Sequence, residues 1–291
     1  MKKIFVILAA LLLTVACGDA NRQYVRKAIR IMDKQGLFAE GPDWESARAG
    51  ALSAKPGSIE EAQEIVRTAA GVAGGKHSFL QLDGSVTADA TSQWPAPEVT
   101  ITEGNIAVVS LPHFSGNQGE GVKYASAVLQ AIPEDVRGVV IDLRGNTGGN
   151  MYPMIAAVHR FLPNDGEMLR FRTRGRTQWI PLSYAVQTAG VQQQSRIQCP
   201  VAILTDSLTA SSGEATLICF RGLDYVRVFG GPTAGYASAN QPFQLPGGDR
   251  LVLTTGCDVA RTGEVFCDDP IEPDVPTDTP LEDALEWLDN Q

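Results

Sequence analysis

The residues best suited to chemistry follow a short apolar run. Val201–Thr205 reads as a buried strand, and the hexapeptide Thr209–Glu214 (TASSGE) comes just after it and before a helix-like stretch. This order places a hydroxyl at a helix N-terminus, where free backbone N–H groups and the helix dipole favour negative charge. Acyl transfer uses such an arrangement, with a nucleophile beside an oxyanion hole. A purely structural interpretation is also open, because Ser and Thr are favoured N-cap residues.

Three histidines are available as general bases. His77 lies in the Gly-rich loop Gly74–Ser78, where functional side chains concentrate. The near-neutral pKa of a free imidazole suits a general base. His113, at the end of a predicted strand, is the second candidate, and His159, among apolar helical residues, reads as structural.

Two Gly-rich turns follow other predicted strands. The segment Asp142–Asn150 (DLRGNTGGN) presents backbone N–H groups to an anion. It lacks the GxGxxG and Walker spacings, so donation of a glycine N–H to an oxyanion is favoured over phosphate binding. The structural alternative is a plain turn in which Asp142 and Arg144 brace neighbouring loops. The second turn, Gly230–Tyr236, by itself indicates only a bend.

The N-terminus has the pattern of an export signal. Lys2 and Lys3 precede the apolar run Ile4–Leu13, which is too short to span a bilayer. Residues 1–16 are therefore predicted to be a signal peptide. Cys17 resembles the lipidated cysteine of the bacterial lipoprotein box, which predicts a lipid-anchored cell-envelope protein that faces the periplasm or the exterior. A soluble exported form is the alternative.

Four cysteines remain after Cys17. In an oxidising compartment an even number suggests disulfides, and we expect the pairs Cys257–Cys267 and Cys199–Cys219. Cys219 could instead be a small buried hydrophobe. No His/Cys cluster suggests a metal, and no cofactor is expected. The net charge of −9 argues against nucleic acid, and the one basic stretch, 170–176, reads as a solvated face or as a rim for an acidic ligand.

The periodicity changes along the chain. Residues 20–75 read as an N-terminal helical subdomain, in which Ser58 and Glu61 form a capping box and Asp43 is an N-cap. Residues 76–291 alternate strands with helices, which predicts an α/β core with a partly parallel sheet. The Gln-rich stretch 174–198 is expected to be a lid-like excursion.

Together these motifs resemble the C-terminal processing (tail-specific) and tricorn-type serine peptidase family. The resemblance covers about residues 22–280, and its most specific parts are Asp142–Gly149 and Thr209–Glu214. It implies a ClpP/crotonase-like mixed sheet preceded by helices. Too few residues separate His77 from the strand near 105 for a PDZ domain, so the nisin-resistance-like branch fits best.

The resemblance also implies roles for individual residues. Ser211 would be the nucleophile, and Gly149 and Ser212 would donate the oxyanion-hole N–H groups. The tail-specific branch uses a downstream lysine, but this chain has none from 212 to 291. His77 matches the early histidine of the tricorn and nisin-resistance branches, with Ser78 beside it. Tricorn-type enzymes add a glutamate near the C-terminus, for which Glu264, Asp268 and Asp269 are the nearby candidates.

The sequence thus predicts an exported serine peptidase that uses a Ser211–His77 dyad on a peptide or protein substrate. The alternative is a catalytically silent relative that binds peptides or apolar ligands in the cell envelope. A third interpretation is an unrelated exported α/β domain with structural cysteines.

Overall fold

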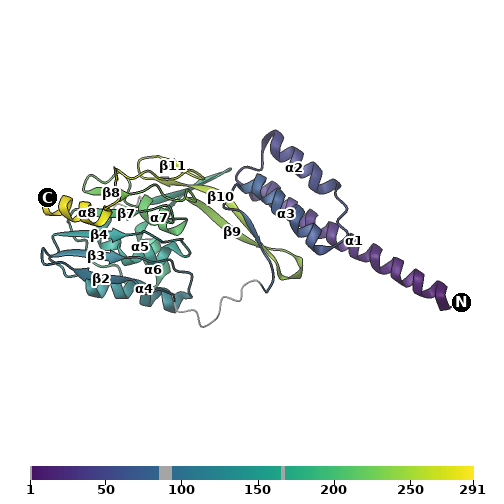
Figure 1. The fold of residues 1–291 in the computed structure, drawn as a ribbon, viewed down its shortest axis with the longest axis horizontal. Coiled ribbons are helices and arrows are strands. Elements are labelled where there is room, and N and C mark those ends of the chain that lie inside the picture. The colour runs from purple at the N-terminus through teal and green to yellow at the C-terminus, as the bar shows by residue number, and fades with distance from the viewer. Residues whose placement is uncertain (1, 85–93, 165–167) are drawn as a thin grey trace. The chain divides into compact units, whose positions relative to one another are not determined.

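The computed structural model describes residues 2–84, 94–164 and 168–291, with side chains from residue 19 onward. The chain forms two compact units (Figure 1). The helical unit comprises Met1–Thr91 and Ala239–Gly256, and the sheet unit comprises Ser92–Ser238 and Cys257–Gln291. The expected boundary after residue 75 is therefore not the boundary between these units, because residues 76–91 and 239–256 belong with the helices.

The helical unit is built on three helices and a small antiparallel pairing. Apolar residues repeat along α1 at helical spacing, and Val25, Ala28, Ile29 and Met32 are all buried, as this spacing predicts. Helix α2 starts with Glu40 as its N-cap, so Asp43 lies in the first turn and not at the cap. The elements of this unit are α1 (Lys2–Gln35), α2 (Gly41–Ser53), α3 (Ile59–Gly74), β1 (Phe79–Gln81), β9 (Ser238–Gln244), η2 (Pro246–Gly248) and the first part of β10 (Arg250–Ala260).

Half of the predicted capping box at α3 is present. The Ser58 side chain accepts from the Glu61 N–H, while the Glu61 carboxylate accepts from the Gly57 N–H and not from that of Ser58. In the same unit, β1 pairs antiparallel with residues 250–252 of β10. The leucines of this pairing join the core under the helices, since Leu80, Leu251 and Leu253 are buried.

The sheet unit alternates strands and helices, as the sequence predicts. Its elements are β2 (Glu98–Ile101), β3 (Ile106–Ser110), α4 (Gln118–Ala131), β4 (Gly138–Asp142), α5 (Met151–Ala157), η1 (His159–Phe161), β5 (Leu169–Thr173), β6 (Thr177–Ile180), α6 (Leu182–Ala189), β7 (Val201–Thr205), α7 (Ser212–Ile218), β8 (Val226–Gly230), β11 (Val265–Phe266), β12 (Val275–Pro276) and α8 (Pro280–Asp289). The expected mixed α/β fold with N-terminal helices is confirmed.

The main sheet has the strand order β12-β8-β7-β4-β3-β2, parallel except for β2 at the edge. Successive side chains of a strand point to opposite faces. Val139 and Ile141 accordingly pack with the cluster that includes α4, α5 and α7, whereas Val140 packs with α8. Helix α8, in yellow in Figure 1, covers that second face. Burial on both faces explains why these strands are continuous apolar runs.

The parallel order brings four turns to one edge of the sheet. Strands β3, β4, β7 and β8 are neighbours and run in the same direction, so the segments after Ser110, Asp142, Thr205 and Gly230 all leave at their carboxyl ends. Open α/β sheets place their ligands at such an edge. The topology therefore gathers the sequence motifs of this unit in one place.

The stretch 174–198, expected to be a lid-like excursion, carries β6 and α6 and buries Ile180, Leu182 and Ala185 in the core. The predicted signal segment and Cys17 fall within α1, where the side chains of residues 1–18 lie outside the described residues. Among the residues that are described, no helix is long and apolar enough to cross a membrane.

Candidate active site

Ser211 has a strained backbone at the end of the turn after β7. Its φ is 51° and its ψ is −113°, and it is the N-cap residue of α7. A non-glycine residue at such angles costs about 1–3 kcal/mol and persists only where the surroundings enforce it. In the described ranges only Asn105 shares a positive φ among non-glycine residues. Strain of this kind concentrates at functional sites, so the conformation supports a chemical role for Ser211.

The Gly-rich turn after β4 packs directly against Ser211. Gly148 and Gly149 have φ angles of +99° and +117°. A Cβ on Gly149 would lie 2.0 Å from the Phe114 carbonyl oxygen, so only glycine fits there. The Ser212 hydroxyl donates to the Gly149 carbonyl oxygen at 2.7 Å, which ties the two turns together.

The two backbone N–H groups predicted for an oxyanion hole are available. Within the part of the chain that the structure describes, the N–H groups of Gly149 and Ser212 donate to no protein acceptor. Ser212 also begins α7, whose N-terminus favours negative charge. The turns can therefore offer two donors to an oxygen anion beside Ser211.

Asn146 links the two turns, a role that sequence reasoning missed. Its side-chain amide donates to the Leu111 carbonyl at 2.8 Å, and its side-chain oxygen accepts from the Gly148 N–H at 2.9 Å. Its own carbonyl accepts from the Ala210 N–H at 2.9 Å. Asn146 is fully buried. Its place in a Gly-rich turn was the only local signal, because Leu111 and Ala210 belong to segments that follow other strands.

Glu214 anchors the nucleophile turn from inside the core. Its buried carboxylate accepts from the Ser211 N–H at 2.8 Å, and also from Thr233, Gly235 and Tyr236 in the turn after β8. Burial raises the pKa of Glu214, but four donors on two oxygens favour the ionised form, which we take as the native one. A hydrogen bond to a charged group contributes about 1.5–3 kcal/mol, enough to offset the strain at Ser211.

His77 lies in the helical unit, after α3. A hydrogen-bond network fixes its loop: the Asn240 side chain donates to the His77 carbonyl at 2.9 Å and accepts from the Thr254 hydroxyl at 2.7 Å. Burial, and secondarily the charge of Lys76, lowers the pKa of His77 to about 4. The imidazole is therefore neutral at pH 7, although burial makes it a weaker proton acceptor than a free histidine.

Of the supporting candidates, Ser78 forms hydrogen bonds with Thr254 on β10. Its hydroxyl accepts from the Thr254 N–H at 3.0 Å and lies 3.2 Å from the Thr254 hydroxyl oxygen. Asp268 and Asp269 lie beside the turn after β8, since a Cβ on Gly235 would come within 2.9 Å of both backbones. These two acids therefore flank the turn that Glu214 holds.

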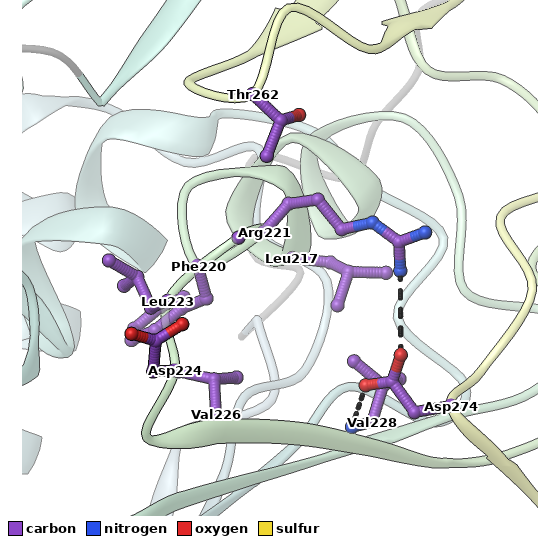
Figure 2. Close-up of a pocket in the computed structure, with 10 residues that line it drawn as sticks. Leu217, Phe220, Arg221, Leu223, Asp224, Val226, Val228, Thr262 and Asp274 are labelled. Atoms are coloured by element: carbon purple, nitrogen blue, oxygen red, sulfur yellow. Dashed lines mark hydrogen bonds and ion pairs between the residues drawn. The ribbon is translucent and has the colours of Figure 1, made fainter.

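Glu264 is engaged at the other end of α7. Its carboxylate accepts from the Arg221 guanidinium at 3.0 Å. Arg221 also points toward Asp274 at 3.8 Å, as Figure 2 shows, and Asp274 accepts from the Val228 N–H at 2.9 Å. Arg221, Val228 and Asp274 border a cavity of about 280 Å³, which is lined by Leu217, Phe220, Arg221, Gly222, Leu223, Asp224, Val226, Val228, Thr262 and Asp274.

The remaining histidines and the Asp142–Arg144 pair have structural contacts. His159 is held at both ring nitrogens, by the Ala156 carbonyl and the Gln194 N–H. His113 packs edge-on against Trp94, with ring centroids 5.9 Å apart. Arg144 pairs with Asp142 at 2.6 Å within its own turn.

One of the two expected disulfides is present. Cys257 and Cys267 are bonded, whereas Cys199 and Cys219 are free thiols, so the second predicted pair was wrong. Cys219 is fully buried in the turn after α7, consistent with the alternative of a small hydrophobe. No group of three or more His, Cys, Asp or Glu side chains in the described ranges could hold a metal ion.

Comparison with known proteins agrees with the fold and the motifs. The pattern of Peptidase family S41 matches residues 105–277. A nisin-resistance protein of Lactococcus lactis subsp. lactis is 31% identical over 280 residues, 93% of this chain and 87% of that protein. A lipoprotein from Streptococcus agalactiae has a TM-score of 0.83 at 30% identity, over 93% of this chain and 96% of that one. The photosystem II D1 C-terminal processing protease shares the fold at 14% identity, with a TM-score of 0.66 over 92% and 97% of the two chains. The chain belongs to peptidase family S41.

Proposed function

We propose that this chain is a serine peptidase in which Ser211 attacks the substrate carbonyl while His77 accepts the hydroxyl proton. The Gly149 and Ser212 N–H groups then bind the oxyanion of the tetrahedral intermediate. When the intermediate collapses, His77 returns the proton to the departing amine and an acyl ester remains on Ser211. Water, deprotonated by His77, hydrolyses that ester and restores the serine.

The main support for this proposal is the strained backbone of Ser211 next to two N–H groups, those of Gly149 and Ser212, that donate to no acceptor in the described residues. Family membership supports a serine peptidase, and the turn geometry supports Ser211 as its nucleophile. Oxyanion donors of this type each account for about 3–4 kcal/mol of transition-state stabilisation. A structural N-cap would need neither the positive φ nor the second donor from Gly149.

The assignment of His77 as base rests on its chemistry and on the sequence. It is neutral at pH 7, its loop is fixed by Asn240 and Thr254, and no lysine follows Ser211. Conversion of a serine hydroxyl into a nucleophile requires a base within reach. His113 is the competing candidate.

Labelling with a fluorophosphonate probe, followed by intact mass spectrometry, tests both assignments. We expect the wild type to gain one label, Ser211→Ala to gain none, and His77→Ala to react at least about 100-fold more slowly. His113→Ala is the comparator for the base. Continued labelling of Ser211→Ala would move the nucleophile elsewhere, and a larger loss with His113→Ala would reassign the base. An unlabelled wild type that binds peptides would favour the catalytically silent alternative.

We also propose a lipid-anchored location in the cell envelope and a peptide substrate. The pattern Lys2–Cys17 and the lipoprotein relative support the anchor, and nisin is the first peptide to test because a relative is named for resistance to it. Cys17→Ser should move the protein from the membrane fraction to the soluble exported fraction. Retention of the variant in the membrane fraction would contradict the anchor.

A further inference from the structure

Thr233 stands between the nucleophile turn and the C-terminal segment of the sheet unit. Its buried hydroxyl donates to Glu214 Oε1 and accepts from the Ile271 N–H at 2.8 Å. Its backbone N–H donates to the Ile271 carbonyl oxygen at 3.1 Å. One side chain thus connects Glu214 to the segment that follows the Cys257–Cys267 disulfide.

Each of the two carboxylate oxygens of Glu214 accepts two hydrogen bonds. Oε2 accepts from the N–H groups of Ser211 and Tyr236, both at 2.8 Å, and Oε1 accepts from Thr233 and from the Gly235 N–H at 2.9 Å. Because a carboxylate is planar and rigid, the donors on Oε1 determine where Oε2 lies. The position of Oε2 in turn determines where the Ser211 N–H is held.

We propose that Thr233 is a positioning residue for the nucleophile, acting through Glu214 to hold Ser211 in its positive-φ conformation. This inference rests on the proposed function and adds a residue to which that function assigns no role. The neighbouring acid, Asp258 on β10, is fully buried and its Oδ1 has no hydrogen-bond partner within the described residues.

Without the Thr233 hydroxyl, Glu214 Oε1 keeps one donor and the carboxylate can turn. The Ser211 N–H then loses its fixed acceptor, and the strained conformation loses the bond that offsets its cost. A displacement of about 1 Å at a reacting group can lower a rate by about 100-fold. Binding of the probe should change little, because Thr233 is buried behind the turn and not in contact with the probe.

Three variants distinguish an effect of Thr233 on the position of Ser211 from a general loss of protein stability. Thr233→Val keeps the shape and removes the hydroxyl, and Thr233→Ser keeps the hydroxyl. Thr205→Val is the matched control, because Thr205 is equally buried and donates to the Gly231 carbonyl at 2.8 Å without touching Glu214. The readouts are the maximal inactivation rate and the half-saturating concentration of a fluorophosphonate probe, together with a crystal structure of Thr233→Val.

We expect Thr233→Val to lower the maximal rate by about 10- to 100-fold at an unchanged half-saturating concentration. Thr233→Ser and Thr205→Val should stay within about threefold of the wild type. In the Thr233→Val crystal structure, Ser211 should leave positive φ or Glu214 should leave the Ser211 N–H. Equal losses in Thr205→Val or Thr233→Ser, or an unchanged Ser211, would overturn the proposal. If the wild type fails to react, the proposed function is wrong, and the crystal structure alone then decides the role of Thr233.

Discussion

The backbone of Gly148 lies against the side chain of Ser211 so closely that a Cβ built on Gly148 would sit 2.8 Å from the Ser211 Cβ. The same Cβ would lie 3.1 Å from the Ser212 nitrogen. Real Cβ atoms do not approach one another to this distance. The absence of a side chain at Gly148 therefore allows the turn after β4 to lie this close to the nucleophile.

Gly148→Ala should lower the labelling rate of Ser211 by about 100-fold, because the new methyl group displaces the nucleophile turn. Gly145→Ala is the matched control: its φ is also positive, +69°, but its Cβ meets nothing within 4 Å. Both variants should lose about 1 kcal/mol or more of folding free energy from the positive φ. Probe kinetics and urea unfolding measure the two effects. Equal labelling rates would show that the contact does not matter.

Ser211→Gly should be more stable than Ser211→Ala by about 1 kcal/mol, although neither variant can form an acyl ester. Glycine adopts a positive φ without strain, whereas alanine keeps the strain of the native serine. Ser207, an exposed turn residue whose φ is not positive, provides the comparison. The Ser207→Gly variant should be no more stable than the Ser207→Ala variant. Urea unfolding of the four variants tests the prediction, and a Ser211→Gly variant that is less stable than Ser211→Ala would contradict the strain.

The His77 imidazole should titrate with a midpoint near pH 4 in the folded protein, because burial and Lys76 lower its pKa to about 4. In the unfolded chain the midpoint is about 6.5. Between these values the unfolded chain binds the extra proton, so this group lowers stability as the pH falls from about 6.5 to 4. NMR titration of the ring gives the midpoint directly.

The difference in the pKa of His77 between the folded and unfolded protein can also be measured as a pH-dependent change in the free energy of unfolding. His77→Gln removes the titration, so the difference in unfolding free energy between pH 7 and pH 4.5 should shrink by about 2 kcal/mol relative to the wild type. His113→Gln serves as the control. A ring midpoint near 6.5, or no change in the pH dependence, would show that His77 is solvated in the folded protein.

Peptide mapping without reduction should find Cys257 linked to Cys267 and leave Cys199 and Cys219 unlinked. Burial raises the pKa of the Cys199 thiol to about 11, so its alkylation in the native protein should be about 100-fold slower than in urea. Burial also raises the pKa of Cys219. Replacement of both disulfide cysteines by serine should cost about 2–3 kcal/mol, because the bond closes a short loop. A Cys199–Cys219 peptide would contradict the structure.

Local patterns in the sequence were sufficient for most elements of the sheet unit. The strands near 106–110, 138–142 and 201–205 are apolar because both faces of the sheet are covered. The polar average composition of the stretch 174–198 did not indicate how much of it is buried. Its few apolar residues, such as Leu182 and Ala185, are spaced to face the core, and burial depends on that spacing and not on the average.

The sequence alone determined the order of the motifs, the family, the Gly-rich turns and Ser211 as candidate nucleophile, because each of these is local in the chain. The tertiary structure alone decided that Asn146, Glu214 and Thr233 hold the turns together, and that Cys199 and Cys219 stay apart. Hydrogen bonds between distant strands depend on strand order and register, which no short window of residues contains. For the same reason a serine that reads as a helix cap acquires its strained conformation only when Gly148 and Glu214 are folded against it.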